Sequence, residues 1–118
     1  MISVVLPYRN AAATLAAAID STLADPDCAE LVAVDDGSTD DGPAIALDRA
    51  RHDGRVVTLS TGGRGVAEAM AMGVSVARGD LVGRMDADDI SLAGRFAAAR
   101  ELLEQDPSIA VGAVRVEA

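Results

Sequence analysis

The sequence predicts one α/β domain, in which helices flank a parallel sheet. Short runs of β-branched and aliphatic residues alternate with longer alanine-rich stretches that have a helical period. The length of 118 residues leaves room for one hydrophobic core. Tyr8 and Phe96 are the only aromatic residues, so aliphatic side chains and methionine must build that core. We therefore expect residues 1–118 to form a single Rossmann-like domain.

The first strand and helix follow from two different periods. Residues 2–6 are apolar apart from Ser3, which is typical of a strand buried on both faces. Leucine or isoleucine then recurs at every fourth position from 15 to 23 and forms one apolar stripe of a helix. Asn10 is placed to cap this helix, and the Asp-Pro-Asp run at 25–27 ends it.

The middle of the chain predicts two further strands with a helix between them. Short β-rich runs at 31–34 and 55–60 are the second and third expected strands, and turn residues bound them. A helix is expected over 40–52, with Ser38 and Asp41 at the spacing of a capping box.

The remainder repeats the same alternation. A helix over 66–77 has the apolar face Val66, Met70, Gly73, Val74 and Ala77. A fourth strand at 81–85 and a helix with apolar positions between 92 and 103 follow. Pro107 ends that helix before a last strand at 109–116.

The charge and the cysteine content limit the ligands and the cellular location that we expect. The formal net charge is −9, and all ten basic residues are arginine, so general nucleic-acid binding is not expected. A phosphate ligand would need local help from a metal, arginine or backbone N–H groups. Cys28 is the only cysteine, which favours a reducing compartment. No basic leader or membrane-length apolar run is present, so we expect a cytoplasmic protein without a membrane segment.

Polar residues follow three of the predicted strands. In parallel α/β sheets, ligands bind beyond the carboxyl ends of the strands, near the point where the strand order reverses. The segments in question are Pro7-Tyr8-Arg9-Asn10, Asp35-Asp36-Gly37-Ser38 and Asp86-Ala87-Asp88-Asp89. Their shared position predicts a binding site at that edge.

Asp86 and Asp88 are the candidate metal ligands. Residues i and i+2 of an extended segment point to the same side, so both carboxylates can face one ion. Mn²⁺ and Mg²⁺ prefer oxygen ligands, often one or two carboxylates together with substrate phosphates and water. The alternative is that these residues cap the helix expected from about Ser91, although one aspartate would suffice for a cap.

The other candidates are assigned to a nucleotide. Asp35 and Asp36 can accept hydrogen bonds from a base or ribose, or they can belong to a tight turn. Arg64 follows two glycines and opens a helix, where it can meet a pyrophosphate or lie free on the surface. Tyr8 and Arg9 can stack on a base, and Tyr8 can equally fill space after Pro7.

Taken in order, these motifs resemble the first half of a family-2 glycosyltransferase. The opening strand with its Pro-x-x-Asn turn at 7–10 is similar to the start of that family. The run Val-Asp-Asp-Gly-Ser-Thr-Asp at 34–40 matches a family signature, and Met-Asp-Ala-Asp-Asp at 85–89 matches its metal motif. Arg64-Gly65 resembles an Arg/Asn-x-Gly stretch. Arg9 and Ala71 depart from the family, which commonly has an aromatic residue and an asparagine there.

The resemblance implies a GT-A fold and inverting transfer of a sugar from a UDP-, GDP- or dTDP-sugar. It places Asp35 or Asp36 near the base and ribose. It also places Asp86 and Asp88 around Mn²⁺ or Mg²⁺ and the diphosphate. The general base is expected in a later, acceptor-binding half that residues 1–118 do not contain. The acceptor is not identified, and no role is assigned to Asp89.

Three alternatives compete with this interpretation. One is a fragment that binds the donor without transferring sugar, and an exposed sheet edge would then favour self-association. Another is a dinucleotide-dependent oxidoreductase, but position 68 is Glu where a third glycine is required. A phosphoacceptor receiver domain needs a lysine, and the chain has none.

Overall fold

The computed structural model describes residues 1–90 and residue 101, and it confirms the α/β class. The elements in chain order are β1 (Ile2–Tyr8), α1 (Leu15–Leu23), β2 (Cys28–Asp35), α2 (Gly42–His52), β3 (Val56–Ser60), α3 (Val66–Val76) and β4 (Leu81–Arg84). Apart from residue 101, the helix expected from about residue 91 and the strand expected at 109–116 lie outside the described residues.

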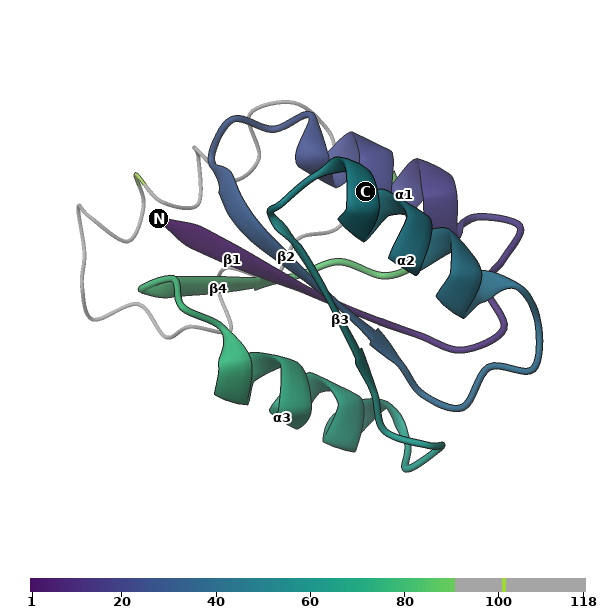
Figure 1. The fold of residues 1–118 in the computed structure, drawn as a ribbon. Helices are drawn as coiled ribbons and strands as arrows, with labels where there is room; N and C mark the ends of the chain where they lie inside the picture. The colour runs from purple at the N-terminus through teal and green to yellow at the C-terminus, as the bar shows by residue number, and fades with distance from the viewer. Residues whose placement is uncertain (91–100, 102–118) are drawn as a thin grey trace.

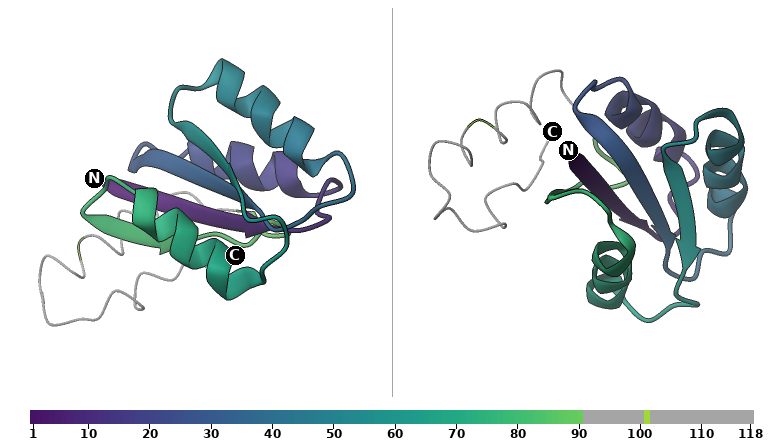
Figure 2. Two further views of the ribbon diagram at one scale, coloured as in Figure 1. Left: turned by 60° about the horizontal axis from the view of Figure 1, so that its bottom comes forward. Right: turned by 60° about the vertical axis from the view of Figure 1, so that its left-hand side comes forward.

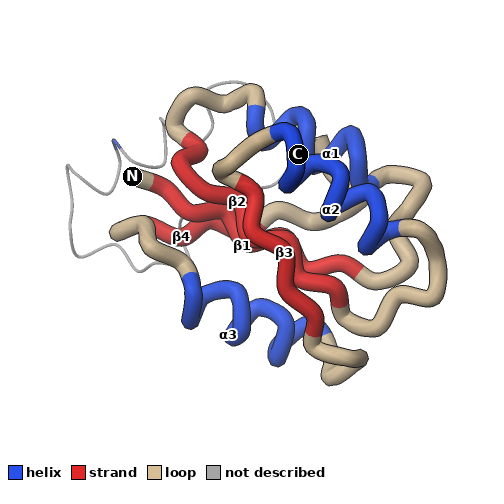
Figure 3. The backbone as a smooth tube through the Cα atoms, in the orientation of Figure 1, coloured by secondary structure: helices blue, strands red, loops and turns tan. Residues whose placement is uncertain are grey.

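The strands form one sheet in the order β3-β2-β1-β4, and every neighbouring pair is parallel. Helices α1 and α2 cover one face of the sheet, and α3 covers the other (Figures 1 and 2). The chain moves outward from β1 to β3 and then crosses back to place β4 on the other side of β1 (Figure 3). The strand order therefore reverses between β1 and β4.

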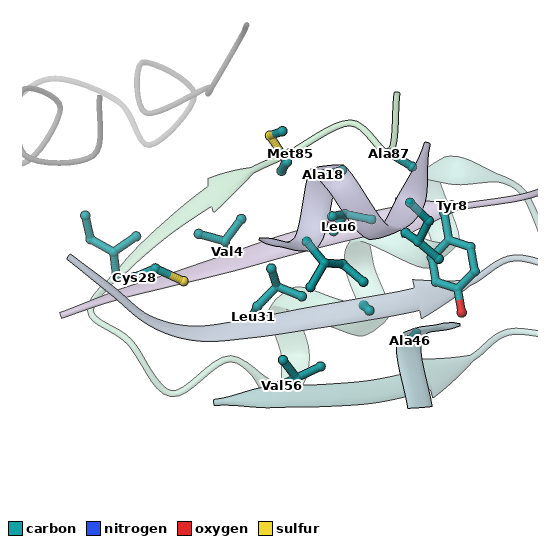
Figure 4. Close-up of a cluster of buried hydrophobic side chains, with 14 residues drawn as sticks. Val4, Leu6, Tyr8, Ala18, Cys28, Leu31, Ala46, Val56, Met85 and Ala87 are labelled. Carbon is teal, nitrogen blue, oxygen red and sulfur yellow. The ribbon is translucent and has the colours of Figure 1, made fainter. Parts of the chain in front are cut away.

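The core lies on both faces of β1, because every residue of that strand is buried. Val4 and Leu6 belong to the cluster under α1 and α2, which Figure 4 shows, whereas Val5 belongs to the cluster under α3. This alternation is the period of a strand with two covered faces. It explains why apolar residues occupy both alternating sets of positions in this strand.

Helix α3 lies very close to the sheet. A Cβ atom at Gly73 would collide with the side chain of Val5 and would lie 3.3 Å from Val34 Cγ2. The buried positions of α3 are Ala69 and Gly73. The expected apolar face was therefore wrong in part, because the side chain of Val74 is 46% exposed. Close packing selects small residues here instead of large ones.

Neither predicted N-cap forms. The N-cap of α1 is Thr14, and that of α2 is Asp41, with no side-chain capping bond at either position. Asn10 instead adopts φ 51° and accepts a hydrogen bond from the backbone N–H of Thr39 at 2.7 Å. The Ser38 hydroxyl accepts from the backbone N–H of Asn10 at 3.0 Å. Both side chains join two loops in place of capping their helices.

Within the part of the chain that the structure describes, no helix has both the length and the apolar character needed to cross a membrane.

Candidate functional site

A cleft of about 510 Å³ opens at the carboxyl ends of β1 and β4. Arg9 and Asn10 line it from the β1 side, and Arg84, Asp86 and Asp88 line it from the β4 side. Its volume falls within the range of small-molecule sites, and it lies where the strand order reverses. The cleft is therefore the place where a ligand is expected in this kind of sheet.

The segment after β4 is a turn. The backbone N–H of Asp89 donates to the carbonyl of Asp86 at 3.1 Å, so the expectation of an extended segment was wrong. Ala87 is 8% exposed and belongs to the core cluster, while the residues on either side of it line the cleft. The buried Ala87 thus anchors a turn that presents Asp86 and Asp88 to the same space.

This pair of carboxylates suits a hard divalent cation. Among the described residues, no group of three His, Cys, Asp or Glu side chains gathers as a complete metal site. Mg²⁺-type ions are commonly bound by one or two carboxylates, with phosphate oxygens and waters completing the shell. Asp86 and Asp88 therefore fit a cation that is shared with a phosphate ligand.

Arg84 is a site residue that the sequence reasoning missed. Its Nε donates to Asp86 Oδ1 at 3.1 Å, and both side chains are about one-third exposed, at 36% and 35%. The sequence did contain an indication of this contact. Residues 84 and 86 are two positions apart at the end of a strand, so their side chains can lie on the same side of the sheet.

Asp36 organises the loop before α3. Its Oδ1 accepts hydrogen bonds from the Thr61 hydroxyl at 2.6 Å, the Arg64 N–H at 2.8 Å and the Gly65 N–H at 3.0 Å. The Thr61 bond is the main cause that lowers the pKa of Asp36. Burial opposes it, and the two N–H donors and the charge of Arg9 add to it. The side chain thus stays ionised and fixes the 61–65 loop.

The Asp-Gly-Ser turn is held by close contact and by its own side chains. Asp35 Oδ1 accepts from the backbone N–H of Ser38 at 2.9 Å. Gly37 has φ 89°, and a Cβ there would lie 2.8 Å from the Cα of Gly63. The turn chemistry that the sequence offered as an alternative for Asp35 is therefore present.

Tyr8 is buried, with 5% of its surface exposed, and it belongs to the core cluster (Figure 4). Burial raises the pKa of its hydroxyl, and the negative charges of Asp35 and Asp40 raise it further, so the phenol stays neutral. Arg9 is exposed and lines both the cleft and a neighbouring pocket of about 230 Å³. Asp36 and Val66 line that second pocket as well.

The structure brings most of the predicted residues to this edge. Pro7, Tyr8 and Arg9 share the cleft with Asp86 and Asp88, and the same three share the second pocket with Asp36. Asp35 lines a third hollow beside Tyr8, under Leu47 of α2. The side chain of Arg64 is exposed, and its backbone N–H donates to Asp36 at this edge.

Two loops of the site are fastened to each other. Asp40 Oδ2 accepts from the backbone N–H of Ala12 at 3.0 Å, and Asp40 Oδ1 accepts from the Gly42 N–H at 2.9 Å. Together with the Asn10–Thr39 bond, these contacts join the turn after β1 to the turn after β2. The 7–10 segment is thus held at a fixed place beside the cleft.

The parallel sheet, the helices on its two faces and the cleft at its switch point define a GT-A type domain. The chain is similar in structure to the mannosyltransferase PcManGT from Pyrobaculum calidifontis in complex with GDP-Man and Mn²⁺. The TM-score is 0.80 at 26% identity, over 92% of this chain and 33% of that one. It is also similar to glucosyl-3-phosphoglycerate synthase from Mycobacterium tuberculosis, in complex with Mn²⁺, UDP and glucosyl-3-phosphoglycerate. There the TM-score is 0.70 at 28% identity, over 90% of this chain and 40% of that one.

The chain belongs to glycosyl transferase family 2, whose model matches residues 3–118. It is 39% identical over 109 residues to the succinoglycan biosynthesis protein ExoU of Rhizobium meliloti, covering 89% of this chain and 30% of the relative. It is 31% identical to the uncharacterized glycosyltransferase EpsJ of Bacillus subtilis, over 95% of this chain and 33% of the relative. The chain therefore spans about a third of the length of these relatives.

Proposed function

We propose that residues 1–118 form the donor-binding part of an inverting, metal-dependent glycosyltransferase. The donor is a UDP-, GDP- or dTDP-sugar, and the acceptor half with its general base belongs to a further part of the enzyme. A cytoplasmic location is included in the proposal and rests on Cys28 being the only cysteine in the chain. Self-association through an exposed sheet edge remains a prediction.

The observation that carries the proposal is the lining of the cleft at the switch point. Two arginines, Arg9 and Arg84, and two aspartates, Asp86 and Asp88, meet in one space. The whole chain has a net charge of −9, so a diphosphate would be repelled from most of its surface. This cleft combines cationic side chains with oxygen ligands for a cation, which is what a diphosphate needs.

Different residues of the chain would bind the metal, the nucleoside and the phosphates. Asp86 and Asp88 would hold Mn²⁺ or Mg²⁺, which when bound neutralises the charge that grows on the leaving diphosphate. Pro7, Tyr8 and Arg9 would border the nucleoside, with Asp35 and Asp36 on the side of its base and ribose. Arg64 would add a positive charge near the amino end of α3, where a phosphate is favoured.

Calorimetry on the 118-residue chain tests this proposal. UDP, GDP and dTDP are titrated with and without Mn²⁺, and NAD serves as the control ligand for a dinucleotide-binding domain. We expect one nucleoside diphosphate to bind about 100-fold more tightly with Mn²⁺, because a metal contributes several kcal/mol to such sites. Saturable NAD binding without any diphosphate binding would overturn the proposal.

A further inference from the structure

The ion pair between Arg84 and Asp86 lies at the metal end of the cleft. Arg84 is the last residue of β4, and its Nε reaches Asp86 Oδ1 at 3.1 Å. Both side chains line the cleft together with Asp88. One oxygen of a carboxylate that we assign to the cation is therefore engaged by a guanidinium.

We propose that Arg84 is a built-in substitute cation, which pairs with Asp86 when metal is absent and releases it when metal binds. This inference rests on the proposed function, because it takes Asp86 and Asp88 as the cation ligands. Two carboxylates in one cleft repel each other unless a positive charge lies nearby. Arg84 supplies that charge directly at Asp86.

The exposure of the pair makes such an exchange feasible. The two side chains are 36% and 35% exposed, so water can solvate the guanidinium after it leaves Asp86. Partly exposed ion pairs contribute little, and a bound Mn²⁺ gains far more from the same oxygen. Arg84 therefore competes with the cation weakly enough to be displaced.

The sign of one substitution separates this role from a positioning role. If Arg84 competes with the metal, Arg84→Gln removes both the competing contact and a repelling charge. Mn²⁺ then binds about two- to fivefold more tightly. If Arg84 mainly orients Asp86 for the metal, the same change weakens Mn²⁺ binding, as loss of a supporting contact does at other metal sites.

The test is a titration of the full chain with Mn²⁺ alone, followed by the electron paramagnetic resonance signal of free Mn²⁺. Arg84→Gln and Arg84→Met give two neutral side chains, so one folded variant is enough for the comparison, and circular dichroism confirms the fold. Arg84→Lys keeps the charge and is expected to bind Mn²⁺ as the unmodified chain does. Arg51→Gln removes an exposed arginine of α2 and is the control for net charge.

Tighter Mn²⁺ binding in the neutral Arg84 variants, but not in Arg51→Gln, supports the proposal. Unchanged or weaker binding in those variants, while the unmodified chain binds Mn²⁺, overturns this inference alone. If the unmodified chain binds no Mn²⁺ alone, the titration is repeated with UDP present, and a chain that binds no Mn²⁺ under either condition refutes both the proposed cation site and the inference.

Discussion

The acidic side chains at the two ends of the sheet differ in their burial and in their hydrogen-bond partners. At the amino end, the side chain of Glu30 is 3% exposed, and its carboxylate accepts from the Ser3 hydroxyl at 2.9 Å. It also accepts from the backbone N–H of Arg78 at 3.0 Å and from Arg78 Nε at 2.9 Å. The Ser3 hydroxyl in turn accepts from the Gly79 N–H at 2.8 Å. These contacts join β1 and β2 to the turn before β4.

At the carboxyl end, Asp36 is buried and bonded, but the two acids of the turn after β4, Asp86 and Asp88, remain open to solvent. Asp88 is exposed, and Asp86 pairs with Arg84, whose side chain is itself about one-third exposed. A closed network of buried groups stabilises the fold, whereas an open pair of carboxylates has unused lone pairs for a ligand. We infer that the network at the amino edge stabilises the fold, and the proposed function assigns ligand binding to the open carboxylates at the carboxyl edge.

The largest expected effect is the loss of metal-dependent binding in Asp88→Asn. The amide cannot supply the charged oxygen that a hard cation prefers, so the whole Mn²⁺-dependent gain in nucleotide affinity, about 100-fold, should disappear. Calorimetry with UDP in the presence and absence of Mn²⁺ measures this. Thermal unfolding should stay unchanged or improve slightly, because one of two neighbouring negative charges is removed.

A matched control keeps this prediction specific. Asp48→Asn makes the same chemical change on the exposed side of α2, where Asp48 pairs with Arg49 at the surface. It should leave the effect of Mn²⁺ intact. If Asp88→Asn retained the full Mn²⁺-dependent gain, the carboxyl edge would lose its assigned role.

A smaller effect is expected for Glu30→Gln, which should lower the stability of the fold and leave ligand binding unchanged. The amide keeps one acceptor oxygen but loses the charge and the bond with Arg78 Nε. The free energy of unfolding should therefore fall by about 1–2 kcal/mol, while nucleotide and Mn²⁺ affinities stay the same. Urea denaturation and calorimetry on the same preparations measure both quantities. A change in Mn²⁺ affinity would show that the two ends are not independent.

The smallest expected effect is in the acid dependence of stability. Burial raises the pKa of Glu30, but the bonds from Arg78 and Ser3 outweigh it, and the net pKa lies below the ordinary value of 4.5. A carboxyl group with a lowered folded pKa contributes stability above its unfolded pKa and loses it as the pH falls through the folded value.

The stability difference between the unmodified chain and Glu30→Gln should therefore narrow as the pH falls below about 4.5. Denaturation curves from neutral pH into this acid range measure it. A difference that stays constant over the whole range would mean that the charge of Glu30 contributes nothing. Asp36 and Asp53 also have lowered pKa values and should keep an acid dependence in both proteins.

The strands were predictable because their signal is local. Apolar residues at 2 and 4–6 follow from the burial of β1 on both faces, and the helices that cover those faces alternate with the strands along the chain. Even the carboxyl edge could be predicted, because parallel strands in such sheets deliver their ends to the same side. Arg9, Asp86 and Asp88 were expected at one edge for this reason, and they do line one cleft.

The features that the sequence did not predict depend on contacts between distant parts of the chain. Asn10 looks like a helix cap in the sequence, but its partner, Thr39, is 29 residues away. The expected face of α3 was wrong in part because Gly73 packs on Val5 from a different element. Arg84 was predicted only as a strand residue, because its contact with Asp86 depends on the turn that follows β4.

One structure determination tests the central claim most directly: crystals of the chain soaked with Mn²⁺ and UDP. We expect the ion between Asp86 and Asp88, with the diphosphate in the cleft between the ends of β1 and β4, and Arg84 turned away from Asp86. A nucleotide bound elsewhere, or Mn²⁺ bound away from both aspartates, would contradict the account.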